Sequence, residues 1–167
     1  TTNTPTKNPT KNVEKKAAVT RTIWGASISP YVRKVLVTMY EKNLPFEHKE
    51  ILPISLLEAT KAEVPVDFAK ASPFGKIPAF LEKSSEGTEF YLQDSDVIMN
   101  YLDAVETKIP LRPKCAKANA KVSKTIKYGD DELSRSTHRL LVELVVKPNI
   151  LKTQTDDALV KTILEID

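Results

Sequence analysis

The chain has 167 residues, of which 41% are hydrophobic, and this apolar share is enough for a buried core. The formal net charge of +3 arises within residues 1–20, so the rest of the chain is balanced and offers no basic stripe that would displace counterions from phosphates. No apolar run approaches the ~18 residues that a membrane-spanning helix requires. We therefore expect neither nucleic acid nor a membrane as a partner.

Cysteine and histidine are both scarce. Cys115 is the single cysteine, which excludes an intramolecular disulfide and a cysteine zinc cluster, and we interpret it as an ordinary surface or interface residue. This usage fits a reducing compartment, so we expect a cytoplasmic protein. His48 and His138 lie far apart, and neither has the spacing of a metal-binding motif. We therefore expect no metal.

The first elements in chain order are a polar arm, a strand and a helix. Residues 1–17 are rich in Thr, Asn, Pro and Lys and are interpreted as a disordered arm. A short β-rich run then ends at Gly25, which predicts a strand. The next segment predicts a helix with Asn43 as its left-handed cap. Its apolar residues at helical spacing are Val32, Val35, Leu36 and Met39.

The next elements are a second strand, a helical connection and a β-hairpin. The second strand alternates around Phe46, His48 and Ile51, and residues 55–71 predict an irregular helical connection broken by Pro65. The hairpin has strands KIPAFLE and EFYLQ, joined by the turn SSEG. A helix over residues 94–105 follows, and its expected inward residues are Val97, Ile98, Tyr101 and Leu102.

The order β-α-β-α-β-β-α over residues 18–105 predicts an α/β domain with a mixed sheet. A proline-flanked linker, KIPLRPK, separates it from an all-α region over residues 112–167. We expect one long helix over residues 116–146, stopped by Pro148, and then a further helix. Two helices cannot enclose a core, so they must pack on the first domain or on a partner subunit.

Three local features have both a plain and a functional interpretation. Ser29 before Pro30 is a common start for a helix, with serine as N-cap and proline at the first helical position. Pro78 within a strand belongs at an edge or in an unusual backbone, and a cis bond occurs in about 5% of such pairs. Asp94 and Ser95 begin a helix, where free N–H groups attract anions. Each feature alone fits the plain interpretation.

Together these features resemble the cytosolic glutathione S-transferase family, in particular its serine-type members. The matching segments are SPYVRKV (29–35), EKNLPFE (41–47), SPFGKIPAF (72–80) and DSDVIMNYL (94–102). The resemblance implies a thioredoxin-like N-terminal domain that holds glutathione and a helical domain that supplies the electrophile pocket. Family members continue through further helices, so the second domain of this chain is expected to be partial.

The resemblance also implies a glutathione site, residue by residue. Pro78 would be the cis proline that exposes the N–H and C=O of Ile77 to the cysteinyl backbone of glutathione, as in strand addition. Lys76 would favour the glycine carboxylate. Ser95 would bind the γ-glutamyl carboxylate. Asp94 would face the γ-glutamyl ammonium, although the family usually has the longer Glu or Gln there.

Ser29 would then contact the glutathione sulfur and act as the catalytic residue. Ser27, two positions earlier, remains an alternative for this contact. Lowering a thiol pKa of about 8.5 by two units requires about 2.7 kcal/mol. A hydrogen bond to a charged group contributes ~1.5–3 kcal/mol and a helix N-terminus ~0.3–1 kcal/mol, which together are sufficient.

Two functions remain open from the sequence. The first is a homodimeric enzyme that conjugates or reduces small electrophiles with glutathione, using no metal, with the helix at residues 94–105 and the long helix after it at the dimer interface. The second is a non-catalytic binding or regulatory module of the same family. The set Ser29, Lys76, Pro78, Asp94 and Ser95 favours the enzyme. The short second domain favours the module.

Overall fold

The computed structural model describes residues 19–165. The disordered arm predicted for residues 1–17 lies outside this range. Within it, none of the helices has the length and apolar character needed to span a bilayer.

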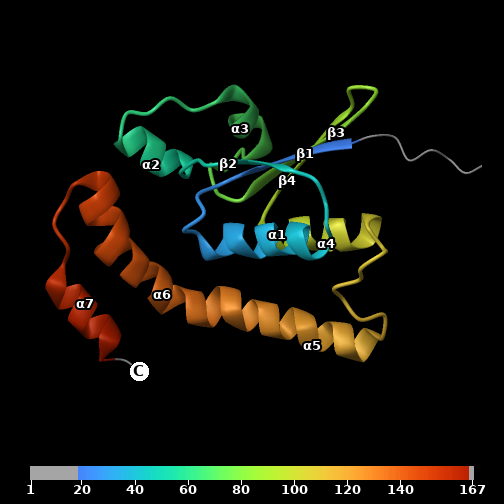
Figure 1. The fold of residues 1–167 in the computed structure, drawn as a ribbon. Coiled ribbons are helices and arrows are strands. Elements are labelled where there is room, and N and C mark those ends of the chain that lie inside the picture. Colours follow the sequence, from blue (N-terminus) through green and yellow to red (C-terminus); the bar gives the residue numbers. More distant parts are fainter. Residues whose placement is uncertain (1–18, 166–167) are drawn as a thin grey trace, which may run out of the picture.

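A four-stranded mixed sheet forms the centre of the first part of the chain (Figure 1). Its strands are β1 (Val19–Trp24), β2 (Glu47–Lys49), β3 (Ala79–Ser84) and β4 (Glu89–Gln93). They lie in the order β2-β1-β3-β4, with β1 parallel to β2 and antiparallel to β3, and with β3 and β4 forming an antiparallel hairpin. This is the mixed sheet of a thioredoxin-like fold, as predicted.

The register of the sheet aligns the ends of all four strands. Trp24 pairs with Lys49 on one side and with Ala79 on the other, and Ala79 pairs with Gln93. The four residues therefore form one row across the sheet. The chain leaves β1, β2 and β4, and enters β3, at this same edge.

Helices cover both faces of the sheet (Figure 1). Helices α1 (Pro30–Glu41) and α4 (Ser95–Val105) lie on one face, and the short helices α2 (Ile54–Ala59) and α3 (Val66–Ala71) lie on the other. The period-2 alternation of β1 explains the two cores, because Ile23 points to α1 and α4 while the next residue points to α2 and α3. We call residues 19–105 the α/β part.

The helices of the α/β part agree with the predicted order, with two differences in detail. The predicted helical connection consists of two helices, and Pro65 begins the second of them. Val32, Val35 and Met39 are buried as predicted. Val97, however, is 47% exposed, so the expectation that it points inward was wrong. It lies one position from the buried Ile98 and therefore about 100° around the helix from the core.

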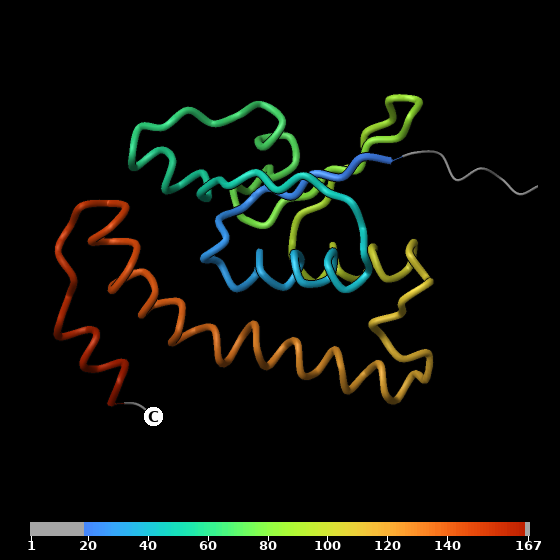
Figure 2. Tube along the Cα trace, viewed as in Figure 1, coloured from blue at the N-terminus to red at the C-terminus, as the bar shows by residue number. Residues whose placement is uncertain are grey.

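The rest of the chain is helical, and we call residues 116–164 the helical part. Figure 2 shows its first helices running alongside α1 and α4, with the last helix turning back beside α6. Two of its segments have the wider π-helical turns. In chain order the elements are α5 (Ala116–Lys127), η1 (Tyr128–Leu133), α6 (Ser134–Leu141), η2 (Val142–Leu151) and α7 (Asp157–Leu164).

Pro148 does not end the long helix, which corrects the prediction from the sequence. The helical run passes through Pro148 as the π-helical segment η2 and ends at Leu151. Proline removes one backbone donor and crowds the preceding α-helical turn, and a wider turn relieves that conflict. Lys152 then takes a left-handed conformation with φ 56° and stops the run.

Candidate functional site

The loop after β1 is tied to the end of β2. The Gly25 N–H donates to the Lys49 carbonyl at 3.1 Å, and Nε2 of His48 donates to the Gly25 carbonyl at 2.8 Å. Gly25 has φ 150°, and a Cβ atom there would lie 2.4 Å from Cγ2 of Val32. The absence of a side chain at Gly25 thus lets the loop pass close to the first turn of α1.

Ser29 is the N-cap of α1. Its Oγ accepts a hydrogen bond from the Val32 N–H at 3.4 Å, and Pro30 occupies the first helical position. The residue is buried, with 9% of its surface exposed. Within residues 19–165 the hydroxyl donates no hydrogen bond. Its proton is therefore available to a ligand, because a hydroxyl can accept and donate at the same time.

Ser27 differs from Ser29 in its exposure and in its hydrogen-bond partners. It is exposed, and both its hydroxyl and its N–H donate to the carboxylate of Glu50, the latter at 2.9 Å. Its carbonyl accepts from Nε of Arg33 at 2.7 Å. Sequence reasoning did not find Glu50, since it lies 23 positions from Ser27 and belongs to no recognised motif.

The segment that enters β3 lies beside this loop. The Ile77–Pro78 peptide bond is cis, and Pro78 is buried. The Cβ of Ile77 lies 3.3 Å from the position that a Gly25 Cβ would take. Ser72, which is fully buried, donates from Oγ to the Lys76 carbonyl at 2.6 Å and holds the segment, while the Lys76 side chain is exposed. Within residues 19–165, neither backbone polar group of Ile77 has a hydrogen-bond partner.

The site has three components: the loop after β1, the segment that enters β3 and the start of α4. Asp94 is the N-cap of α4, and Oδ1 accepts from the N–H groups of Asp96 at 2.9 Å and Val97 at 3.2 Å. Its φ of 77° is uncommon for a residue with a side chain, and such backbone conformations cluster at functional sites. Ser95 is buried, and within the described range its hydroxyl has no hydrogen-bond partner. Oε1 of Gln93, just before the cap, is also buried, and it has no hydrogen-bond partner among residues 19–165.

The structure brings these three components to one edge of the sheet. They follow Trp24, precede Ala79 and follow Gln93, and these residues form the row described above. Neighbouring strands are about 4.8 Å apart, so the row from β1 to β4 spans about 10 Å. An extended tripeptide spans at most about 10 Å. The edge therefore matches a bound tripeptide in length, and it offers a hydroxyl, an open backbone and a helix N-terminus.

Two groups outside the α/β part, Cys115 and Lys127, have shifted pKa values. The side-chain hydrogen bond to Asp131 raises the pKa of Lys127, and the charges of Asp131 and, more weakly, of Asp94 act in the same direction. Cys115 is exposed, and hydrogen bonds from the backbone of Ala118 and Lys117 lower the pKa of its thiol. Within residues 19–165, no group of three or more His, Cys, Asp and Glu side chains is placed to hold a metal ion.

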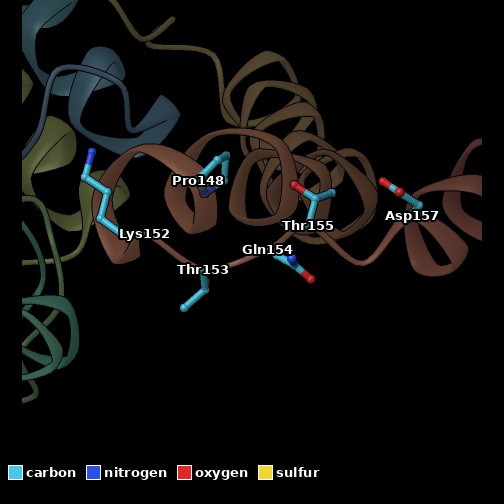
Figure 3. A pocket seen from close by; sticks show the side chains of 6 residues that line it. All are labelled: Pro148, Lys152, Thr153, Gln154, Thr155 and Asp157. Carbon is cyan, nitrogen blue, oxygen red and sulfur yellow. The ribbon is translucent and has the colours of Figure 1, made fainter.

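Two open hollows lie outside this edge. One, of about 670 Å³, lies between η2 and α7, and Figure 3 shows Lys152 and Asp157 at its opposite ends. The other, of about 550 Å³, lies where Tyr31 of α1 meets η1 and α6. None of the six residues predicted to bind glutathione lines either hollow.

A family comparison decides the classification of the chain. The family described as "Glutathione S-transferase, N-terminal domain" matches residues 24–107, which are half of the chain and contain all three components of the edge. The chain belongs to the glutathione S-transferase family. Members of this family use glutathione as a co-substrate.

Individual relatives of this glutathione S-transferase chain are distant. A glutathione S-transferase of Hyoscyamus muticus is 29% identical over 138 residues, covering 81% of this chain and 60% of that protein. Two solved structures share the fold: FzlA from C. crescentus, with TM-score 0.72 and 21% identity, and glutathione transferase F2 from Populus trichocarpa, with TM-score 0.67 and 23% identity. Each match covers 87% of this chain, and the matched part is 62% of the FzlA chain and 64% of the glutathione transferase F2 chain. The chain thus spans less than two thirds of the relatives it matches.

Proposed function

We propose that this chain binds glutathione along the sheet edge and, as a glutathione transferase, uses the thiolate to conjugate or reduce small electrophiles. The observation that carries the proposal is the row of Trp24, Ala79 and Gln93, because it brings three features separated in sequence to one edge. Glutathione presents groups that match them: a thiol, an extended cysteinyl backbone and a γ-glutamyl carboxylate.

Each component has one part of glutathione to bind. The free N–H and C=O of Ile77 pair with the cysteinyl backbone as an added strand would. The exposed amino group of Lys76 attracts the glycine carboxylate. The Ser95 hydroxyl and the N-terminus of α4 receive the γ-glutamyl carboxylate. Asp94 faces the γ-glutamyl ammonium with the carboxylate oxygen that its own helix leaves free.

Ser29, rather than Ser27, is the residue that we assign to the sulfur. The Ser27 hydroxyl already donates to Glu50, whereas the Ser29 hydroxyl keeps its proton available and lies at a helix N-terminus. One hydrogen bond to the thiolate contributes ~1.5–3 kcal/mol and the helix ~0.3–1 kcal/mol. These sums suffice to lower a thiol pKa by about two units, so much of the bound glutathione is thiolate at neutral pH.

The reaction is then nucleophilic attack by sulfur. The thiol proton passes to solvent on binding, and Ser29 stabilises the thiolate that remains. A sulfur electron pair forms the bond to the electrophilic carbon, and the leaving group departs with the electron pair of the broken bond. Protein residues thus need only to hold glutathione and stabilise its thiolate.

The test is glutathione binding by calorimetry, followed by titration of the thiolate absorbance of the complex. We expect a bound thiol pKa well below about 8.5. Ser29→Ala should raise that bound pKa by more than about one unit, since the hydrogen bond is worth ~1.5–3 kcal/mol. Ser27→Ala is the matched control and should leave it unchanged. Absence of thiolate absorbance near neutral pH in the wild-type complex would contradict the enzyme.

A second candidate function is a module that binds glutathione without turnover. One observation favours it: Oδ1 of Asp94 is engaged by the N–H groups of its own helix, and the side chain is shorter than that of the Glu or Gln usual in the family. A weaker hold on the γ-glutamyl ammonium would misplace the thiol. Turnover by the wild type distinguishes the candidates, because an enzyme consumes the electrophile and a module binds glutathione without consuming it. If the short Asp94 is the cause of absent turnover, Asp94→Glu should restore it.

We further propose a cytoplasmic homodimer that needs no metal and serves in detoxification. Val97 and Val105 lie exposed on α4, and a second copy packed on α4 and the following long helix would cover them. Sedimentation equilibrium checks the stoichiometry. Val97→Glu should shift the dimer toward monomer by placing a charge in the interface.

A further inference from the structure

The hollow beside α1 lies close to the serine assigned to the sulfur. It has a volume of about 550 Å³, within the ~300–1,000 Å³ range typical of small-molecule sites. Tyr31 forms its α1 side and lies two residues after Ser29, so their Cα atoms are at most about 7 Å apart. Its opposite side belongs to η1 and α6. A molecule in the hollow would therefore lie beside the first turn of α1, near the serine to which the proposed function assigns the thiolate.

Beside the hollow, contacts join α1 of the α/β part to η1 of the helical part, and we call this boundary the seam. Tyr31 donates from its hydroxyl to the Asp130 carbonyl at 3.3 Å, and Nζ of Lys34 contacts both carboxylate oxygens of Asp130 at 2.6 and 2.7 Å. Asp130 lies on η1, and π-helical turns inside longer helices occur frequently at functional sites.

The charges that line the hollow do not cancel. Of its three acids, Asp130 is paired with Lys34, and Asp131 is paired with Lys127 at 3.2 Å. Glu132 has no ion-pair partner within the described range. Arg135 and Arg139 of α6 also have no ion-pair partner within the described range. The unpaired charges that line the hollow are therefore two guanidinium groups and one carboxylate. The two arginines are four positions apart, so they lie on one face of the helix, toward the hollow.

We propose that this hollow binds an electrophile that carries a carboxylate or sulfonate, and that Arg135 and Arg139 select it by that anion. The inference rests on the proposed function for the thiolate that attacks the bound molecule. Guanidinium groups match the planar carboxylate through paired N–H donors, which a lysine cannot do. A neutral electrophile of the same shape would lack these contacts.

The reaction is written for 4-chloro-3-nitrobenzoate as the anionic probe. A sulfur electron pair of the thiolate forms a bond to the ring carbon that carries chlorine. The carbon–chlorine bond breaks, and chloride leaves with the bonding pair. The carboxylate, para to this carbon, stays unchanged and is the group that the arginines hold.

The first experiment measures binding without any reaction. Calorimetry compares 3-nitrobenzoate with 3-nitrobenzamide, its neutral analogue, in the glutathione-loaded protein. We expect the benzoate to bind about fivefold tighter, the size of an exposed charge interaction, with the preference falling as salt rises. Arg135→Gln combined with Arg139→Gln should abolish the preference. Lys117→Gln combined with Lys121→Gln removes the same charge from exposed sites outside the hollow and should retain it.

The second experiment measures turnover with 4-chloro-3-nitrobenzoate and 4-chloro-3-nitrobenzamide. The ratio of their kcat/KM values, each corrected for the uncatalysed rate, should fall about fivefold in the double arginine variant. If neither probe is turned over, the proposed function fails, and the binding experiment still decides on the hollow. Equal affinities in the wild type, or a preference that survives in the double arginine variant, would overturn the inference.

Discussion

In the α/β part, six side chains of one core are fully buried, whereas in residues 116–164 the buried apolar side chains are Val146 and Ile163. Helices α5, η1 and α6 bury no residue at all, and Leu133 is 71% exposed. The six side chains of the first core are Ile23, Val35, Met39, Phe80, Ile98 and Leu102.

The contacts that join the two parts differ in kind from the core. They include Lys34 with Asp130, and Arg112 of the linker, which donates to Asp96 of α4 at 2.6 Å and to Asn119 of α5 at 3.3 Å. Polar contacts at a surface stabilise weakly and respond to salt. The α/β part therefore has a core of its own, whereas polar contacts position the helical part. Five predictions test this comparison.

The largest effect is expected from the core of the α/β part. Phe80→Ala should lower the free energy of unfolding by about 3–5 kcal/mol, because it leaves a cavity between the sheet and the α1–α4 layer. Urea unfolding measures it. Ile163→Ala, in the helical part, is the comparison variant. It should leave the amide protection of β1 and α1 unchanged in hydrogen exchange. Equal loss of protection throughout the chain would show one cooperative unit instead.

The next effect concerns a buried ion pair. Nζ of Lys42 is 2.7 Å from Oδ1 of Asp103 and also donates to the carbonyls of Glu106 and Ile109. Asp103→Asn should cost about 3 kcal/mol at neutral pH, because it leaves the buried ammonium without a counter-charge. Thermal unfolding measures this cost, and a cost below about 1 kcal/mol would contradict burial of the pair.

The same variant predicts a pH dependence. Burial alone would raise the pKa of Asp103, but hydrogen bonds from the Leu111 backbone and Lys42 outweigh it and lower the pKa. A lowered folded-state pKa means stability that is fully present above the unfolded value of about 3.9 and is lost as pH falls through the folded value. Below about pH 4, stability should therefore fall less steeply with pH in Asp103→Asn than in the wild type.

A smaller effect is expected at the loop that carries Ser29. Gly25→Ala should cost about 1–3 kcal/mol, because the new Cβ would overlap Cγ2 of Val32. It should also weaken glutathione binding by moving the cap of α1. Val32→Ala removes the overlapping atom, so Gly25→Ala should cost less in that background. Equal costs in both backgrounds, by urea unfolding, would assign the effect to the backbone conformation alone.

The smallest effect is expected at the seam. Lys34→Met removes an ion pair whose side chains are 28% and 20% exposed, so it should cost less than about 1 kcal/mol. It should nevertheless increase hydrogen exchange in η1 and leave exchange in β3 unchanged. Comparison with Asp103→Asn contrasts two lysine–aspartate pairs that differ mainly in burial. A cost as large as that of Asp103→Asn would make the seam part of the core.

Local patterns predicted most of the α/β part. The apolar spacing of Val32, Val35 and Met39 marked α1, and the β-rich runs marked three of the strands, because periodicity reports directly on which face is buried. Only Glu47–Lys49 of the second predicted strand pairs with β1, so the alternation through Phe46 and Ile51 overstated it. The predictions that Val97 points inward and that Pro148 ends the helix were wrong for a related reason. The rotation of a helix on the sheet and the formation of π-helical turns both depend on packing.

The two helix caps follow from local sequence, because Ser29 and Asp94 accept from N–H groups only two or three residues away. The position of these caps and of Pro78 at one edge depends on the fold, since strand register is set by contacts between residues far apart in the chain. The fold also distinguishes Ser29 from Ser27. Two serines in one loop look alike in sequence, but the carboxylate of Glu50, just after the neighbouring strand, accepts hydrogen bonds from Ser27 and not from Ser29.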